Sequence, residues 1–298
     1  PTNAIASHSI AHVFFERGDH SGGADFLGHW IQSYDSREPY HVHLSWHVAL
    51  FALAMGHYKE AVNIYETNIR PSVILKSPIS LSDSASLMWR LYIYPDSPPP
   101  LTWTIVQQQA LPAVEGPGPA FRDAHAALAF AGLADNVYMG RLIDRLSVLA
   151  DKGNVLTADV TLPLVRGIEA FGHGAYTDTI RFMEPIFDPR ARMDQLSRIG
   201  GSHAQREVFE DTLVAAYLKT ENFHKAETIL RKRLKRRESA RDYFWLGHAQ
   251  ANKGESAAAK VNLSKATKQW QDADHDSHEM SALKSLVKRT GSLEATRE

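Results

Sequence analysis

The sequence predicts an all-α protein, a solenoid of stacked helical hairpins with a proline-rich insertion over one face. Apolar residues recur at helical spacing on both sides of a repeated turn, Gly-x-aromatic-x-x-small, and segments with strand character are scarce. The turn occurs in full or degenerate form at Gly18, Gly56, Gly174, Asn222 and Gly254. Gly18 and Gly56 are 38 residues apart, and the last three turns are separated by 48 and 32 residues, which is close to the period of stacked helical hairpins.

The expected hairpins, in chain order, surround Gly18, Gly56, residues 134–136, Gly174, Asn222 and Gly254. The last of these turns is preceded by Trp245-Leu246-Gly247, so that repeat comes close to the tetratricopeptide consensus. The third, within residues 121–149, is degenerate. The sequence therefore predicts a tetratricopeptide-like repeat domain over residues 1–270, followed by a charged linker and a short terminal helix in residues 271–298.

Two segments interrupt the repeats. Residues 70–119 are rich in proline, with helices predicted at 82–92 and 103–110, and we expect this insertion to cover the groove beside the histidines described below. Residues 70–75 are predicted as a loop because prolines bracket them. After an arginine-rich connection, Ser202 and Gln205 form a capping box, which predicts a helix from 203 to about 219.

The composition limits the classes of function. The net charge of −1 provides no global field to attract nucleic acid, and no apolar run is long enough to span a membrane. The basic run at residues 231–237 is interpreted as a solvated helix end. The absence of cysteine excludes disulfides and thiolate chemistry, as is typical of a cytoplasmic protein. Because the chain opens with Pro1-Thr2-Asn3, we expect it to be the C-terminal portion of a longer protein.

Histidines of the first hairpins are the main candidates for a functional site. His8 and His12 form one H-x-x-x-H pair, and His43 and His47 form a second about one hairpin later. Residues four apart share one face of a helix, so each pair presents two imidazoles in one direction. In the repeat register, Trp46 and His125 also point into the concave groove, which predicts a His/Trp-lined pocket.

Further candidates come from later segments. Asp83 and Arg90 lie on one face of the predicted insertion helix, and Gln205 and Arg206 open the helix after Gly-Gly-Ser. Each pair has a structural interpretation, packing for the first and capping with an ion pair for the second. The functional alternative for Arg206 is an anion site at a helix N-terminus.

Three interpretations of the histidines stay open. They can line the core as satisfied polar residues, or bind a small polar ligand or a partner's peptide segment. They can also hold a divalent transition metal through His12, His43, His47 and His125, because neutral imidazoles suit such ions. As an enzyme, the protein would use His47 and His125 for acid–base chemistry with Asp123 tuning them, but no nucleophile elbow, phosphate loop or H-E-x-x-H motif supports a particular reaction.

Several motifs together resemble the tetratricopeptide repeat protein 38-like family. The matching stretches are His8-x-x-Ala11-His12-Val13, His43-x-x-Trp46-His47-x-Ala49-Leu50, Asp83-Ser84-x-Ser86 with Arg90-Leu91, Phe121-x-Asp123-Ala124-His125, Asp159-x-x-Leu162-Pro163-Leu164, and Gly200-Gly201-Ser202-x-Ala204-Gln205-Arg206-x-Val208-Phe209. The sequence departs from the family's pattern at Arg122 and His203, where the family carries Asn. The resemblance implies a helical repeat fold with further repeats upstream, and it implies no particular activity. A helical-repeat binding protein is thus the first hypothesis, and a metal-dependent pocket enzyme is the alternative.

Overall fold

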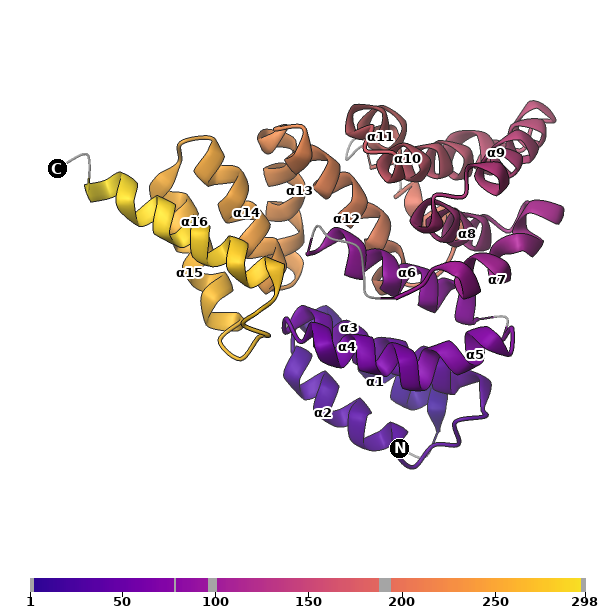
Figure 1. Cartoon of the computed structure of the whole chain (residues 1–298), viewed down its shortest axis with the longest axis horizontal. Helices are drawn as coiled ribbons and strands as arrows, with labels where there is room; N and C mark the ends of the chain where they lie inside the picture. The colour runs from indigo at the N-terminus through magenta and orange to yellow at the C-terminus, as the bar shows by residue number, and fades with distance from the viewer. Residues whose placement is uncertain (1–2, 78, 96–100, 188–193, 296–298) are drawn as a thin grey trace. The chain divides into compact units, whose positions relative to one another are not determined.

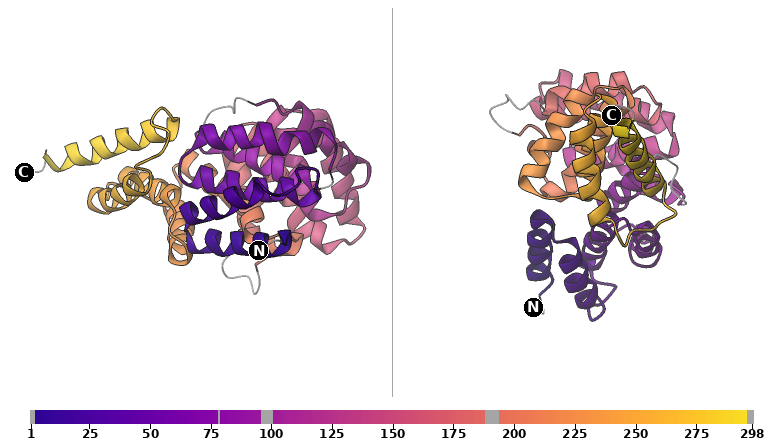
Figure 2. Two further views of the ribbon diagram at one scale, coloured as in Figure 1. Left: turned by 90° about the horizontal axis from the view of Figure 1, so that it is seen from below. Right: turned by 90° about the vertical axis from the view of Figure 1, so that its left-hand side faces the viewer.

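The computed structural model describes residues 3–77, 79–95, 101–187 and 194–295. Within these ranges every regular element is a helix (Figures 1 and 2), which confirms the all-α prediction. The helices divide into two compact units. Unit 1 comprises residues 1–69, 94–97 and 221–298, and unit 2 comprises residues 70–93 and 98–220.

The helices of unit 1 come from both ends of the chain: α1 (Ala4–Arg17), α2 (His20–Ile31), α3 (Pro39–Ala54), α4 (Tyr58–Ile64) with a π-helical turn at Tyr65–Ile69, then α13 (Phe223–Arg236), α14 (Ala240–Asn252), α15 (Ser256–Gln269) and α16 (His278–Ala295). The turns fall where the sequence predicts them. Gly18 closes α1 with a φ of 71°, and Gly56 follows α3 with a φ of 79°. Glycine adopts this left-handed conformation without the steric cost that a side chain would impose.

Helix α3 forms the centre of the first hairpins. It begins at Pro39, whose missing N–H costs nothing in the first turn, and every residue from His41 to Leu53 is buried. A helix buried on all sides presents its polar side chains to other protein atoms rather than to water. The two histidines of the second H-x-x-x-H pair, His43 and His47, lie in this segment.

The C-terminal helices of unit 1 pack onto the turn between α3 and α4. The Trp270 indole N–H donates to the Ala54 carbonyl (2.9 Å), and the Asp274 backbone N–H donates to the Gly56 carbonyl (3.1 Å). The packing is tight, since a Cβ on Gly56 would lie 2.6 Å from the Ala273 Cβ. Residues 271–277, predicted as a linker, are therefore attached to α4. In a regular solenoid each hairpin packs only against its neighbours in the sequence. These contacts join hairpins that are far apart in the sequence, so unit 1 departs from that arrangement.

The basic run at residues 231–237 is only partly solvated. Arg233 is buried and pairs with Asp242 at 3.0 Å, and the Arg237 guanidinium lies 4.1 Å from the centre of the Phe15 ring. The interpretation of a wholly solvated helix end was wrong for these two residues, because each reaches a partner from another hairpin.

Unit 2 contains α5 (Arg70–Ile74), α6 (Ser80–Ile93), α7 (Thr104–Glu115), α8 (Ala120–Leu133), α9 (Asn136–Asp151), a π-helical turn at Thr157–Thr161, α10 (Leu162–Gly172), α11 (Tyr176–Met183), short 3₁₀ turns at Glu184–Phe187 and Leu196–Ile199, and α12 (His203–Lys219). The degenerate third hairpin is confirmed: Ala134 takes a φ of 57° between α8 and α9. The insertion provides α5, α6 and α7, and α6 packs against both α8 and α12.

Two predictions in unit 2 had opposite outcomes. The expected loop at residues 70–75 was wrong, because α5 occupies Arg70–Ile74 and follows the π-helical turn at Tyr65–Ile69 without a break, so that Pro71 lies within a continuous helical stretch. The helix predicted at 203–219 is confirmed at its exact bounds, with both hydrogen bonds of the Ser202–Gln205 capping box present. The proline run at residues 96–100 and the arginine-rich stretch at 188–193 lie outside the described residues. Within the described part, none of the helices has the length and apolar character to cross a bilayer.

Candidate functional site

Four imidazoles from α1 and α3 meet in unit 1. The centre of the His8 ring lies 4.5 Å from that of His12, 4.7 Å from that of His43 and 5.1 Å from that of His47. His47 also lies 4.6 Å from His12 and 4.9 Å from His43. The two H-x-x-x-H pairs thus form one group, which we call the histidine cluster: His8, His12, His43 and His47.

Three Nε2 atoms of the histidine cluster converge. His8 Nε2 lies 2.9 Å from His12 Nε2 and 3.0 Å from His43 Nε2, both at hydrogen-bond distance. Ligand atoms of His8, His43 and His47 all lie within 4.8 Å of one another. Ring nitrogens this close together allow a single bound species to contact more than one imidazole.

His47 is the most deeply placed member. Its side chain is fully buried, and neither ring nitrogen has a hydrogen-bond partner. Buried polar atoms nearly always have a partner, so two unpartnered nitrogens on one side chain require an explanation. Among the described residues, the rings recorded against His47 are the other three imidazoles and the Trp46 indole, whose centre lies 4.8 Å away.

The cluster favours neutral imidazoles. Burial, together with His43 and His12, lowers the pKa of His8 to about 4. Burial and the three neighbouring rings hold the pKa of His47 well below its ordinary value, and burial also lowers the pKa of His12. His8, His12 and His47 therefore favour the uncharged form near neutral pH, and a neutral imidazole has one nitrogen lone pair that can accept a hydrogen bond or bind a metal.

Two aromatic side chains border the cluster. The Trp46 ring stacks on His43 with centres 5.4 Å apart and an interplanar angle of 12°. Tyr40, which the sequence reasoning missed, lies 5.9 Å from His8 and 6.4 Å from His43. A signal was available, because Tyr40 precedes His43 by three residues and so shares its face of α3.

His125 and Asp123 belong to unit 2 and make separate contacts on α8. The His125 Nδ1–H donates to the Phe121 carbonyl (2.7 Å), and its ring packs against Phe121 and Phe209. Burial lowers the pKa of His125 to about 4. Asp123 accepts from the Gly118 N–H (2.6 Å) and from the Arg122 guanidinium (2.9 Å). Asp123 thus fixes the start of its own helix.

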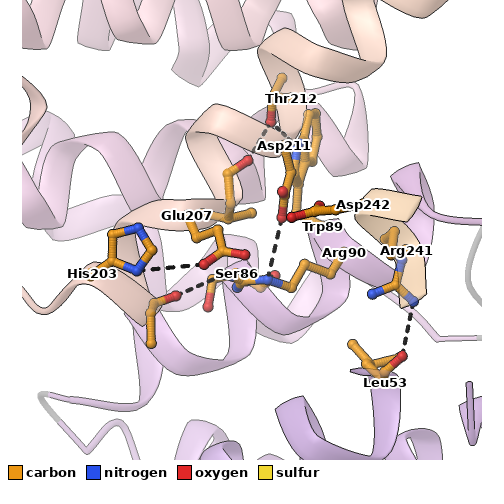
Figure 3. A network of polar contacts seen from close by, with 12 residues as sticks. Leu53, Ser86, Trp89, Arg90, His203, Glu207, Asp211, Thr212, Arg241 and Asp242 are labelled. Atoms are coloured by element: carbon orange, nitrogen blue, oxygen red, sulfur yellow. Dashed lines mark hydrogen bonds and ion pairs between the residues drawn. The ribbon is translucent and has the colours of Figure 1, made fainter. Parts of the chain in front are cut away.

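Asp83 and Arg90 are both buried on α6 of unit 2. Arg90 donates to the Ala204 carbonyl (2.8 Å) and faces Asp211 at 3.9 Å, and the neighbouring Trp89 indole donates to Thr212 (2.9 Å). Figure 3 shows Trp89 and Arg90 directed toward these α12 residues. Arg90 is thus held by α12, in a helix that belongs to the core of unit 2.

Gln205 and Arg206 are occupied by the start of α12. Gln205 Oε1 accepts from the Ser202 N–H (2.8 Å), completing the capping box. Arg206 donates to the carbonyls of Gly200 and Gly201. Both side chains therefore hold the connection before α12.

Two buried acids on α12 were missed by the sequence reasoning. Glu207 lies 3.5 Å from His203, and Asp211 is fully buried opposite Arg90. Their spacing of four residues places both on one helix face, which was the available signal. Acidic residues are rarely buried without a partner, so the sequence by itself predicts that Glu207 and Asp211 are exposed to solvent.

Comparison with known proteins gives a limited result. No family model matches the chain. Among solved structures, a tetratricopeptide repeat protein from Parabacteroides merdae has a TM-score of 0.41 and 14% sequence identity, covering 96% of this chain and 98% of that chain.

Proposed function

We propose that this chain is a tetratricopeptide-like binding protein whose ligand is held by the histidine cluster of unit 1. The proposal includes its relation to the tetratricopeptide repeat protein 38-like family, through the motifs given above. The observation that carries the binding proposal is His47, which is fully buried with both ring nitrogens unpartnered among three other imidazoles.

Missing hydrogen bonds at His47 favour the binding of a ligand. A buried polar atom without a partner costs about 1–3 kcal/mol, so the two nitrogens of His47 form an unfavourable arrangement when nothing else is bound. A ligand that donates to, accepts from or coordinates these nitrogens recovers that energy. His8 and His12 are only partly buried, so they offer such a species a route from solvent. A small polar ligand suits this enclosed group of rings better than a long peptide segment does.

The alternative of a pocket enzyme has no comparable support. Asp123 and His125, proposed for acid–base chemistry, each have structural partners within unit 2. The proposal therefore concerns binding, and no reaction is assigned.

The test is to weigh the intact protein, purified without an affinity tag, chelator or added metal, under native and denaturing conditions. We expect a mass increment in the native wild type that denaturation removes. His8→Ala and His43→Gln should lose the increment, because each removes a nitrogen of the converging group. His29→Ala is the matched control in unit 1, since His29 is exposed and bonds to Asp25 of its own helix.

The mass measurement does not require the identity of the ligand to be known. An increment of any mass that follows the cluster variants supports binding at this site. A wild-type protein with identical native and denatured masses, even after incubation with the small-molecule fraction of a cell extract, would contradict the proposal. Equal loss in His29→Ala would also contradict it.

A further inference from the structure

Building on the proposed function, we propose that the ligand of the histidine cluster is one divalent transition-metal ion, with His8, His43 and His47 as ligands and His12 as the fourth imidazole. The ligand atoms of the first three residues lie within 4.8 Å of one another, and His12 Nε2 lies 2.9 Å from His8 Nε2. A transition-metal ion is a definite chemical class of ligand, which binding at the cluster leaves open.

The donor set selects the kind of ion. All four side chains of the cluster are imidazoles, and among the described residues the group with metal-binding spacing contains no carboxylate. Imidazole nitrogen suits Zn²⁺, Cu²⁺, Ni²⁺ and Fe²⁺, whereas Mg²⁺ and Ca²⁺ require oxygen ligands. The cluster therefore discriminates against the two commonest divalent cations.

The hydrogens and lone pairs that neutral imidazoles can offer favour a bound metal ion over hydrogen bonds among the rings alone. A neutral imidazole nitrogen carries either one hydrogen or one lone pair. His8 Nε2 faces two other Nε2 atoms at hydrogen-bond distance, so it can make only one good hydrogen bond with the pair. A cation between the rings accepts a lone pair from each ligand and removes this conflict.

The distances fit a metal shell after a small adjustment. Zinc–nitrogen bonds of 2.0–2.1 Å place tetrahedral ligand atoms roughly 3.3–3.4 Å apart. The Nε2 separations of 2.9 and 3.0 Å are within about half an ångström of that value. The ligand atoms of the group that includes His47 lie within 4.8 Å of one another, so coordination requires the rings on α1 and α3 to rotate toward a common point.

His47 provides the independent observation that points to a ligand. It is fully buried, directed into the cluster and without a partner at either ring nitrogen. Coordination would give one of these nitrogens a bond to the metal and so remove part of the cost of burying it without a partner. A core histidine that served only packing would have no need of three neighbouring imidazoles.

The experiment uses tag-free protein stripped with a chelator and titrated with Zn²⁺ by calorimetry and with Co²⁺ by visible absorption. We expect one ion per chain and the intense absorption of four-coordinate cobalt with nitrogen ligands. His8→Ala and His43→Gln should each weaken zinc binding by at least roughly 100-fold, since loss of a ligand exceeds the effect of outer-shell changes. His29→Ala should bind as the wild type does, and Mg²⁺ and Ca²⁺ should not compete.

The outcomes separate this inference from the proposed function. His8 is partly exposed, so His8→Ala should keep its helical circular dichroism and provide a folded test even if a variant of buried His47 unfolds. Substoichiometric zinc, or equal zinc affinity in wild type and His8→Ala, would overturn the metal assignment. If native mass measurement instead finds an organic species lost in the same variants, binding at the cluster stands and the metal inference fails.

Discussion

His47 and His125 are both fully buried, yet they differ in their surroundings. His125 places its Nδ1–H on the Phe121 carbonyl and leaves Nε2 without a partner between aromatic rings. His47 has no hydrogen bond and lies among three imidazoles. Burial alone therefore does not identify a ligand site, and the deciding feature is the number of neighbouring imidazoles.

His125 predicts a pH dependence of stability. Burial lowers its pKa from 6.5 in the unfolded chain to about 4 in the fold, so the unfolded state binds a proton first as the pH falls. The contribution of His125 is thus constant above pH 6.5, and stability is lost progressively between pH 6.5 and 4. At pH 5 the loss amounts to on the order of 2 kcal/mol.

Urea denaturation of wild type and His125→Gln at pH 7.5 and pH 5 measures this effect. The difference in unfolding free energy between the two pH values should be smaller in the variant, while His29→Gln, an exposed control, should behave as the wild type does. Identical pH dependence in all three proteins would show that His125 is not held neutral by the fold.

Contact between helices α2 and α3 leaves no room for a side chain at one glycine of α2 but leaves room at another. A Cβ on Gly23 would lie 2.5 Å from the Phe51 ring, whereas a Cβ on Gly28 of the same helix would meet nothing within 4 Å. We expect Gly23→Ala to destabilise the protein by about 1–3 kcal/mol through overpacking. Gly28→Ala should stabilise it by about 0.5–1 kcal/mol, because alanine loses less backbone freedom in a helix.

Denaturant midpoints of the two variants, measured side by side, test this packing. The opposite signs are the essential result, since the same chemical change is made on one helix. A Gly23→Ala protein as stable as Gly28→Ala would place α2 farther from Phe51 than the described contact requires.

Sequence patterns predicted the local features well, because their causes are local. The turns at Gly18 and Gly56 depend on backbone conformation, and the bounds of α12 depend on a cap made by Ser202 and Gln205. The H-x-x-x-H spacing likewise predicted which imidazoles share a face. Features that depend on distant partners were not predictable in this way.

Asp211 and Trp270 illustrate the limit. Asp211 is buried because Arg90 lies opposite it, and Trp270 is buried because the Ala54 carbonyl accepts its N–H. Neither partner is near in sequence, and no spacing rule connects them. The same reason explains why the sequence could name candidate ligands but could not establish that His8 and His43 come within 3.0 Å of each other.

Across unit 1, a buried ion pair between α14 and α16 is linked to the first hairpins by hydrogen bonds of its arginine. Arg241 pairs with Glu279 at 2.9 Å, donates to the Leu53 carbonyl and contacts the Tyr58 hydroxyl. Figure 3 draws the bond from Arg241 to Leu53. We expect Glu279→Gln to lower the unfolding free energy by about 3 kcal/mol or more, because it leaves the Arg241 charge buried without its counter-ion.

Hydrogen exchange and urea denaturation test this attachment. Amide exchange at residues 53–58 should accelerate in Glu279→Gln. Lys59→Ala is the control, because Lys59 pairs with Asp276 at 2.8 Å but both side chains are exposed, and such pairs contribute only about 0–1 kcal/mol. Equal effects of the two substitutions would mean that the buried pair does not hold these hairpins together.

The contribution of both chain ends to unit 1 has a consequence for biosynthesis. A ribosome releases residues 15–58 long before residues 237–279, which complete their contacts. The nascent first hairpins must wait with Leu53 and Ala54 uncovered while the nearly contiguous segments of unit 2 emerge and fold. Closure of unit 1 therefore follows synthesis of unit 2, and a chain that ended after residue 220 would lack the segments that complete unit 1.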